Sequence, residues 1–265
     1  HVQDKIVVIT GGLGQLGRQF ALALADRGAR VVVFDALADK KRIADRFGER
    51  ADDNIRFFAV DVTRRESVAT ALREVIVQWG VPHALINNAA LDAPPNAPAE
   101  ENGPFETYPE SSWDKVIDVN VKGVFVCCQA VGGAMAEAGR GSIVNISSIY
   151  GLVSPNQSIY EYRRAGGQQF YKPVAYSVSK SALFNLTRYL ATYWAGKGVR
   201  VNTLTFAGVF NNQPEEFLKA YLPHLPLDRM AREDEYNGAL IFLVSEASSY
   251  MTGSNMIIDG GWTAW

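Results

Sequence analysis

The sequence predicts an α/β fold, a doubly wound parallel sheet of about seven strands with helices on both faces, formed by residues 1–265 as one domain. Short, continuously apolar runs alternate with amphipathic stretches of helical length. Strands that are apolar on both faces are typical of parallel sheets. The alternation continues along the chain without an obvious linker, internal repeat or low-complexity tract, so a second domain is not expected.

The elements are expected in a regular order. The first strand is the β-branched run from Ile6 to Thr10, and Gly28 ends the helix that follows it. Val68, Leu72 and Val75 recur at helical spacing in a later segment. We expect strands over 6–10, 30–35, 55–60, 84–87, 142–146, 200–204 and 255–258. We expect helices over 16–27, 39–48, 66–79 and 176–195, and a late helix that includes 240–244.

Three segments interrupt this alternation: 91–110, rich in Pro; 152–174, rich in aromatic residues, Arg and Gly; and 209–231. Long segments of this kind in a compact domain are usually lids or binding loops. We therefore expect all three to be substrate loops.

Composition excludes several classes of partner. The net charge is −2 and no stretch is strongly basic, so neither nucleic acid nor a membrane surface is expected as a partner. No apolar run reaches membrane-spanning length, and a cytoplasmic location is expected. Adjacent Cys127 and Cys128 are expected to be buried thiols rather than a disulfide. His83 and His224 have no partners at ligand spacing, so no metal site is expected.

A glycine-rich turn follows the first strand and opens the first helix. Glycine permits a tight turn and a close approach of ligand to backbone, and the helix directs its free N–H groups toward the turn. Asp35 ends the second strand, where a carboxylate can accept hydrogen bonds from ribose hydroxyls and would repel the phosphate of NADP. With no basic residue at Gln15 or Ala36, the pattern predicts that NAD is the cofactor. The residues of the turn expected to contact it are Gly11, Gly14, Gln15, Leu16 and Gly17.

Tyr176 and Lys180 are four residues apart in a predicted helix, so they share one face. A nearby ammonium stabilises a phenolate and lowers the pKa of tyrosine, which would allow Tyr176 to exchange a proton with an alcohol or ketone oxygen. The pair alone is common on helices. Here Ser148 follows the fifth strand and Asn88 the fourth, and polar residues at strand carboxyl ends line the ligand crevice of such sheets.

The chain resembles the short-chain dehydrogenase/reductase family over its whole length, which implies a Rossmann-type fold. The landmarks stand in the family's order: the turn at 10–17, Asp61-Val62, Asn87-Asn88-Ala89-Ala90, Val119-Asn120-Val121, Asn145-Ile146-Ser147-Ser148, Tyr176 to Lys180, Arg200-Val201-Asn202 and Asp259-Gly260-Gly261. The resemblance implies an enzyme that transfers a hydride between a nicotinamide and a secondary alcohol or ketone.

The resemblance also implies roles for single residues. Tyr176 would be the general acid/base, and Lys180 would lower its pKa and bind the nicotinamide ribose. Ser148 would bind the substrate oxygen, and Asn120 would hold a water in a proton path to Lys180. Asp61 and Val62 would contact the adenine, with Asn88, Ala89, Ala90 and Val209 as further cofactor contacts.

Three features depart from the family pattern. Gly14-Gln15 stands where short members usually place glycine second, and Ala207-Gly208 replaces an expected Pro-Gly. The segment between Ser148 and Tyr176 is longer than usual. These departures leave the cofactor-side turns and the substrate loop as the least certain parts of the resemblance.

The long segment should overhang the active site. Tyr150 and Tyr160 suit stacking on a sugar face, whereas Arg163 and Arg164 suit a phosphate or carboxylate. A solvated loop or a subunit contact is an equal alternative. The segment also resembles the branch that modifies sugars of bacterial flagellin and surface glycans, so the predicted substrate is a sugar, a sugar phosphate or a related polyol.

Two alternatives stay open: a ketoreductase of acyl thioesters or small secondary-alcohol dehydrogenase, and a non-catalytic dinucleotide-binding sensor. The complete set of Asn120, Ser148, Tyr176 and Lys180 argues against the sensor, which has no need of a proton relay. A homodimer or homotetramer is expected by resemblance only.

Overall fold

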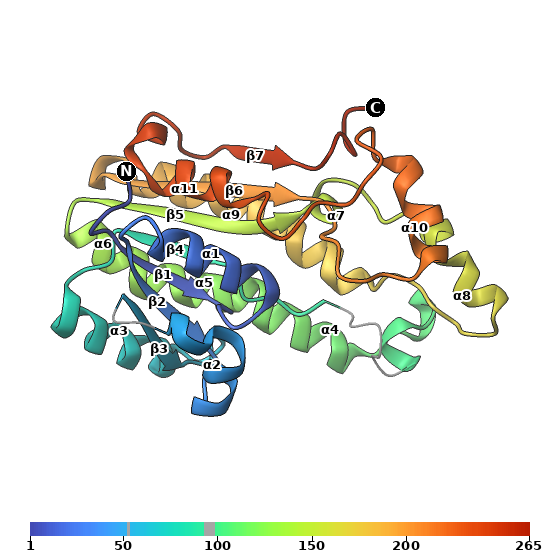
Figure 1. The fold of residues 1–265 in the computed structure, drawn as a ribbon, viewed down its shortest axis with the longest axis horizontal. Helices are drawn as coiled ribbons and strands as arrows, with labels where there is room; N and C mark the ends of the chain where they lie inside the picture. Colours follow the sequence, from blue (N-terminus) through green and yellow to red (C-terminus); the bar gives the residue numbers. More distant parts are fainter. Residues whose placement is uncertain (52–53, 93–98) are drawn as a thin grey trace.

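A seven-stranded parallel sheet forms the centre of the molecule, with the strand order β3-β2-β1-β4-β5-β6-β7 (Figure 1). The computed structural model describes residues 1–51, 54–92 and 99–265. The strands are β1 Ile6–Thr10, β2 Arg30–Asp35, β3 Ile55–Ala59, β4 Ala84–Asn87, β5 Gly141–Ser148, β6 Val199–Phe206 and β7 Asn255–Ile258. The predicted doubly wound fold is confirmed, and the order reverses between β1 and β4, where such sheets bind ligands.

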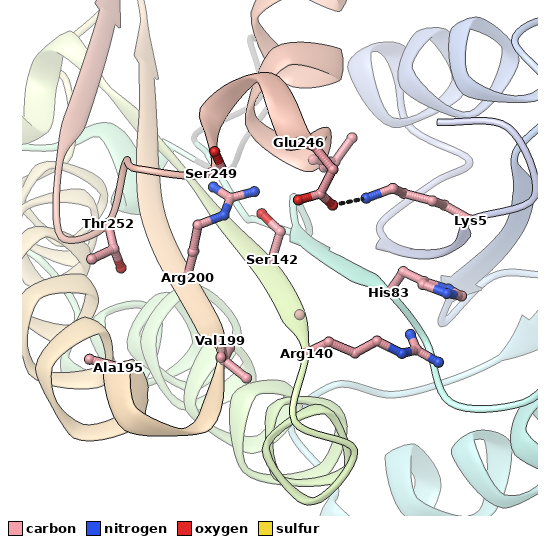
Figure 2. A pocket seen from close by; sticks show the side chains of 13 residues that line it. Lys5, His83, Arg140, Ser142, Ala195, Val199, Arg200, Glu246, Ser249 and Thr252 are labelled. Carbon is pink, nitrogen blue, oxygen red and sulfur yellow. Dashed lines mark hydrogen bonds and ion pairs between the residues drawn. The ribbon is translucent and has the colours of Figure 1, made fainter. Parts of the chain in front are cut away.

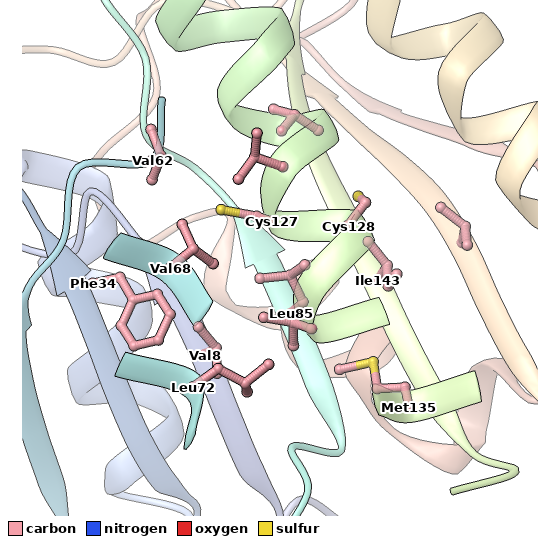
Figure 3. Packing of buried hydrophobic residues seen from close by; sticks show 14 of the residues in the cluster. Val8, Phe34, Val62, Val68, Leu72, Leu85, Cys127, Cys128, Met135 and Ile143 are labelled. Carbon is pink, nitrogen blue, oxygen red and sulfur yellow. The ribbon is translucent and has the colours of Figure 1, made fainter. Parts of the chain in front are cut away.

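Helices cover both faces because successive residues of a strand point to opposite sides. Val7 and Ile9 of β1 pack with α1 Gln15–Ala25, α2 Lys40–Phe47 and α11 Asn237–Val244. Val8 of the same strand packs on the other face, with α3 Arg65–Trp79 and α9 Val174–Trp194. Figure 3 shows this second cluster, in which Phe34, Val68 and Leu72 lie around Val8.

One long helical stretch, 110–137, also belongs to the second face. It consists of α4 Glu110–Ile117, α5 Gly123–Cys127 and α6 Gly133–Glu137, joined by π-helical turns over Asp118–Lys122 and Cys128–Gly132. Its length and apolar composition would suffice to cross a membrane, but half of its apolar window is buried inside the domain. Cys127 and Cys128 are both buried and unpaired, as expected.

Two strands are longer than the sequence indicated. Strand β5 continues through Ser147 and Ser148, which pair in parallel register with Thr205 and Phe206 of β6. Polar residues ended both predicted strands, yet here they take part in the ladder. The extension carries Ser148 to the carboxyl edge of the sheet, beside the switch in strand order.

Short helices gather beyond this carboxyl edge: α7 Ile149–Leu152, α8 Glu161–Ala165 and α10 Glu215–Tyr221 (Figure 1). Segment 152–174, expected to be irregular, thus contains α8 and a 3-10 turn at Gln157–Tyr160. A third apolar cluster holds these pieces together and includes Tyr150, Tyr160, Phe170, Tyr221 and Trp262. Of the predicted loop 91–110, residues 93–98 lie outside the described residues.

Candidate active site

A cavity of about 640 Å³ lies at the carboxyl ends of β5 and β6. All three predicted substrate segments contribute to its wall, together with the start of α1 and of α9. The residues that line it are Gln15, Leu16, Ala90, Leu91, Asp92, Ser148, Ile149, Tyr150, Tyr160, Tyr162, Arg163, Phe170, Lys172, Tyr176, Phe206, Ala207, Gly208, Val209, Asn211, Gln213, Pro214, Phe217, Tyr221 and Met230.

The glycine turn leaves no room for side chains. Gly11 has φ +65°, and a Cβ there would lie 2.8 Å from the Cα of Ala89. A Cβ on Gly17 would collide with the Gly11 carbonyl. Helix α1 begins at Gln15, and its N-cap residue Gly14 provides no side-chain hydrogen bond, so the first N–H groups are open to an anion. This cradle fits the pyrophosphate of a dinucleotide.

Asp35 lies beside the turn. Its carboxylate accepts hydrogen bonds from the backbone N–H groups of Leu13 and Leu37, each at 3.0 Å. Two guanidinium groups that the sequence did not single out lie nearby: Arg46 Nε donates to the Leu13 carbonyl at 2.9 Å, and Arg18 Nε donates to the Arg46 carbonyl. Their signal is weak, because each is an ordinary helix arginine until the fold places it at the turn.

The end of β4 supports the turn through Thr10. The backbone N–H groups of Asn88 and Ala89 both donate to Thr10 Oγ1 at 3.0 Å, and the Asn88 side chain donates to the carbonyls of Thr10 and Gly11 at 3.1 Å. Asn88 therefore holds two strand ends together, and Ala90 follows it into the cavity wall.

The other predicted cofactor residues have different surroundings. Asp61 Oδ1 accepts hydrogen bonds from the backbone and side chain of Thr63, at 2.9 and 2.7 Å, and Val62 is buried beside Gly123. Gln15 Nε2 donates to the Phe210 carbonyl at 3.4 Å, and Val209 pairs with Ala231, so both contribute to the opposite rim.

Ser148, Tyr176 and Lys180 meet where β5 ends and α9 begins. Tyr176 lies in the first turn of α9, and Lys180, one turn later, points back beneath it. The Lys180 ammonium lies 5.8 Å from the centre of the Tyr176 ring and donates to the Ile146 carbonyl at 2.9 Å. The Ser148 hydroxyl faces the phenol closely enough to favour the phenolate.

Asn120 connects this group to β4. Its side chain accepts from the Leu91 N–H at 2.7 Å and donates to the Leu91 carbonyl and to Ser179 Oγ, both at 2.9 Å. The residue lies in the first π-helical turn, and π turns often occur at functional sites. Its side chain clamps the loop after β4 onto α9.

Burial controls the ionisation of the group. It raises the pKa of Tyr176, an effect that Asp92 reinforces and Ser148 opposes. This direction is opposite to the one expected from the Tyr–Lys spacing, because loss of water destabilises the phenolate. Burial also lowers the pKa of Lys180 to about 8, and the Asp92 carboxylate partly offsets this change.

The predicted substrate residues are divided between two roles. Tyr150 and Tyr160 are buried and line the cavity, and Arg163 also lines it, with its guanidinium 4.2 Å from the centre of the Phe170 ring. Arg164 is not among the lining residues. It pairs with Glu161 and donates to the Phe170 and Gln157 carbonyls, so it fixes the segment in place.

The sequence analysis missed two charged residues of this wall, Asp92 and Lys172. Lys172 Nζ lies 2.5 Å from Asp92 Oδ1 and 4.9 Å from the centre of the Tyr176 ring. A signal was available: Lys172 and Lys180 each stand four residues from Tyr176, one before it and one after it.

A second cavity, of about 360 Å³, lies at the opposite edge of the sheet (Figure 2). Its cationic side chains are largely engaged: Lys5 pairs with Glu246 at 2.6 Å, and Arg200 donates to the carbonyls of Leu243, Ser245 and Met251. It contains none of the predicted site residues. Within residues 1–51, 54–92 and 99–265, no group of three His, Cys, Asp or Glu is arranged to hold a metal.

Dinucleotide cradle and buried Tyr–Ser–Lys group together define an oxidoreductase that acts on hydroxyl groups. Comparison with known proteins specifies the family. A family model described as enoyl-(acyl carrier protein) reductase matches residues 14–263. The chain belongs to the short-chain dehydrogenase/reductase family.

Three relatives illustrate the match. D-threitol dehydrogenase of Mycolicibacterium smegmatis is 33% identical over 270 residues, covering 99% of this chain and 94% of the relative. A short-chain dehydrogenase of Leptospira borgpetersenii serovar Hardjo-bovis with bound NAD+ has a TM-score of 0.83 at 31% identity, covering 98% of this chain and 93% of that one. An NAD+-bound xylitol dehydrogenase has a TM-score of 0.83 at 25% identity, covering 98% and 99%. The finer resemblance to the flagellin and surface-glycan branch stays a prediction.

Proposed function

We propose that this chain is an NAD-dependent dehydrogenase that oxidises a secondary alcohol of a neutral polyol or sugar, and reduces the ketone in reverse. The observation that carries the proposal is the position of Tyr176 and Ser148 in the wall of one cavity that also includes the glycine turn. The polyol relatives and the polar, aromatic wall support the substrate class.

The four conserved-type polar residues divide the work as follows. Tyr176 takes the proton of the substrate hydroxyl as the carbon–hydrogen bond breaks, and Ser148 donates a hydrogen bond to the same oxygen. When bound, NAD+ supplies the hydride acceptor and a positive ring charge that favours the phenolate. Lys180 adds a second positive charge beneath the phenol, and Asn120 positions α9 through Ser179. A water held by Asn120 in a path to Lys180 stays a prediction.

The preference for NAD over NADP rests on Asp35. A carboxylate at the end of β2 repels an adenosine 2′-phosphate. Arg18 and Arg46, the cations nearest the turn, each direct a guanidinium N–H to a backbone carbonyl. We infer that they support the turn and leave Asp35 to select the cofactor.

A phosphorylated sugar is the second candidate, favoured by Arg163, whose guanidinium lies in the cavity wall. The same assay separates the two. Arg163→Met should abolish a preference for a sugar phosphate and leave turnover of xylitol within about threefold.

The test is NADH formation by the purified chain with xylitol, D-threitol, glycerol, sugar phosphates and simple secondary alcohols. Turnover of a polyol, lost by at least 10³-fold in Tyr176→Phe, is the expected result, since the variant lacks the proton acceptor. Turnover that survives in Tyr176→Phe contradicts the assigned chemistry. Tight NAD binding without turnover of any probe favours the sensor instead.

A further inference from the structure

Lys172 is the second lysine at the catalytic tyrosine, and it lies on the substrate side. Its ammonium is 4.9 Å from the centre of the Tyr176 ring and 5.9 Å from that of Tyr150. Only 9% of its side chain is exposed, so the charge forms part of the cavity wall. The catalytic lysine, Lys180, approaches Tyr176 from the buried side, next to β5.

The charge of Lys172 is balanced by Asp92, whose Oδ1 lies 2.5 Å away. An ammonium has three N–H donors, and within the described residues that of Lys172 makes one hydrogen bond. Two donors are therefore free to bind a ligand. The Asp92 carboxylate offers acceptors next to them, and the pair has no net charge.

The Tyr150 hydroxyl adds a third polar group. Tyr150 is 8% exposed, and its Oη has no hydrogen-bond partner in the described part of the chain. The hydroxyls of Tyr150 and Tyr160 influence each other's pKa without a well-formed hydrogen bond between them. A buried polar atom without a partner is costly, and a ligand group that supplies the bond offsets that cost.

An alcohol hydroxyl matches this environment because it both accepts and donates a hydrogen bond. It can accept from Lys172 or Tyr150 while it donates to Asp92. A carboxylate or phosphate would instead meet the Asp92 charge at close range, since the pair offers no net positive charge to compensate. The group therefore favours neutral hydroxyls over anions.

Ser148 and Tyr176 line the same cavity and would hold the oxygen that reacts. We propose that Tyr150, Asp92 and Lys172 form a subsite that binds the hydroxyl on the carbon next to the reacting one, so that the enzyme selects vicinal diols. The inference deepens the proposed function and rests on it. It assigns the unusually long segment before Tyr176 the task of delivering Lys172 to the substrate.

The test compares two secondary alcohols that differ by one neighbouring hydroxyl, 2,3-butanediol and 2-butanol, with the full chain and NAD+. Wild type should prefer the diol at least 10-fold in kcat/KM. Lys172→Met should lower kcat/KM for the diol by about 10- to 100-fold, mainly through KM, because a charge-assisted hydrogen bond is lost. Turnover of 2-butanol should change less than threefold.

Tyr150→Phe removes one oxygen at nearly constant volume and should reduce only diol turnover, by about 3- to 10-fold. Lys219→Met is the matched control, since it removes an exposed ion pair with Glu215 on α10. NAD binding and the melting temperature show whether each variant is folded.

The outcomes distinguish the two proposals. Equal losses on both alcohols in Lys172→Met, or a wild type that does not distinguish them, overturn the diol subsite while the dehydrogenase assignment stands. A wild type that oxidises neither these alcohols nor any polyol overturns the proposed function, and the subsite with it.

Discussion

Lys180 lies buried with its charge, and this predicts a stability that depends on pH. Only 3% of the residue is exposed, and burial lowers its pKa from 10.5 to about 8. The folded protein therefore binds the proton less well than the unfolded chain. Below pH 8 both states are protonated and the whole penalty, about 3 kcal/mol as an upper limit, acts against folding. As the pH rises from 8 to 10.5 the folded state releases its proton first, and the penalty disappears.

The variant Lys180→Met removes this ammonium while it retains a long side chain. The difference in unfolding free energy between variant and wild type should shift by about 2–3 kcal/mol in favour of wild type between pH 7 and pH 10. The loss of the hydrogen bond to Ile146 adds a term that does not depend on pH, about 1 kcal/mol against the variant. Catalysis should be lost at every pH.

Urea denaturation of both proteins at several pH values from 7 to 10 measures this difference, and other titrating groups cancel in it. Lys219→Met, which changes an exposed lysine, should show a constant difference within about 0.5 kcal/mol. A difference for Lys180→Met that is flat with pH would refute the reasoning, because it would mean that Lys180 titrates alike in both states.

Three further predictions concern the cofactor cradle and the core. Gly17→Ala should weaken NAD binding by more than about 10-fold in calorimetry, since its Cβ meets the Gly11 carbonyl, whereas Gly133→Ala, which has open space, should bind normally. Asp35→Ala should raise the ratio of NADP to NAD efficiency by at least about 10-fold in steady-state kinetics, and an unchanged ratio would remove Asp35 as the selector. Burial raises the pKa of both Cys127 and Cys128, the latter to about 12, so a maleimide should label them only after denaturation, and rapid labelling of the native protein by mass spectrometry would contradict the packing.

The sequence was sufficient for the fold because strong local signals agreed with it. A buried parallel strand such as β1 must be apolar on both faces, and the turn after it must contain glycine where φ is positive or the backbone of another strand is close. Those demands are met within a few residues. The ends of β5 and β6 were missed because Ser147 and Thr205 are polar and yet paired in the ladder.

The substrate wall was predicted only in outline. Tyr150, Tyr221 and Trp262 come from distant parts of the chain and meet in one cluster, which no local pattern shows. Arg163 and Arg164 are adjacent in sequence, yet the turn of α8 directs one to the cavity and the other to backbone carbonyls. The Asp92–Lys172 pair joins residues 80 positions apart, and only the folded chain brings them together.

The π-helical turns of the 110–137 stretch give that helix a reading frame. Each such turn contains one residue more than an α-helical turn, and each residue rotates the helix by about 100°. Loss of one residue within 118–122 would leave every local helix propensity intact, yet it would rotate everything that follows. Exposed Phe125 would turn toward the sheet and buried Cys127 away from it. We expect this stretch to accept substitutions readily but to reject single-residue insertions and deletions, as a coding sequence does.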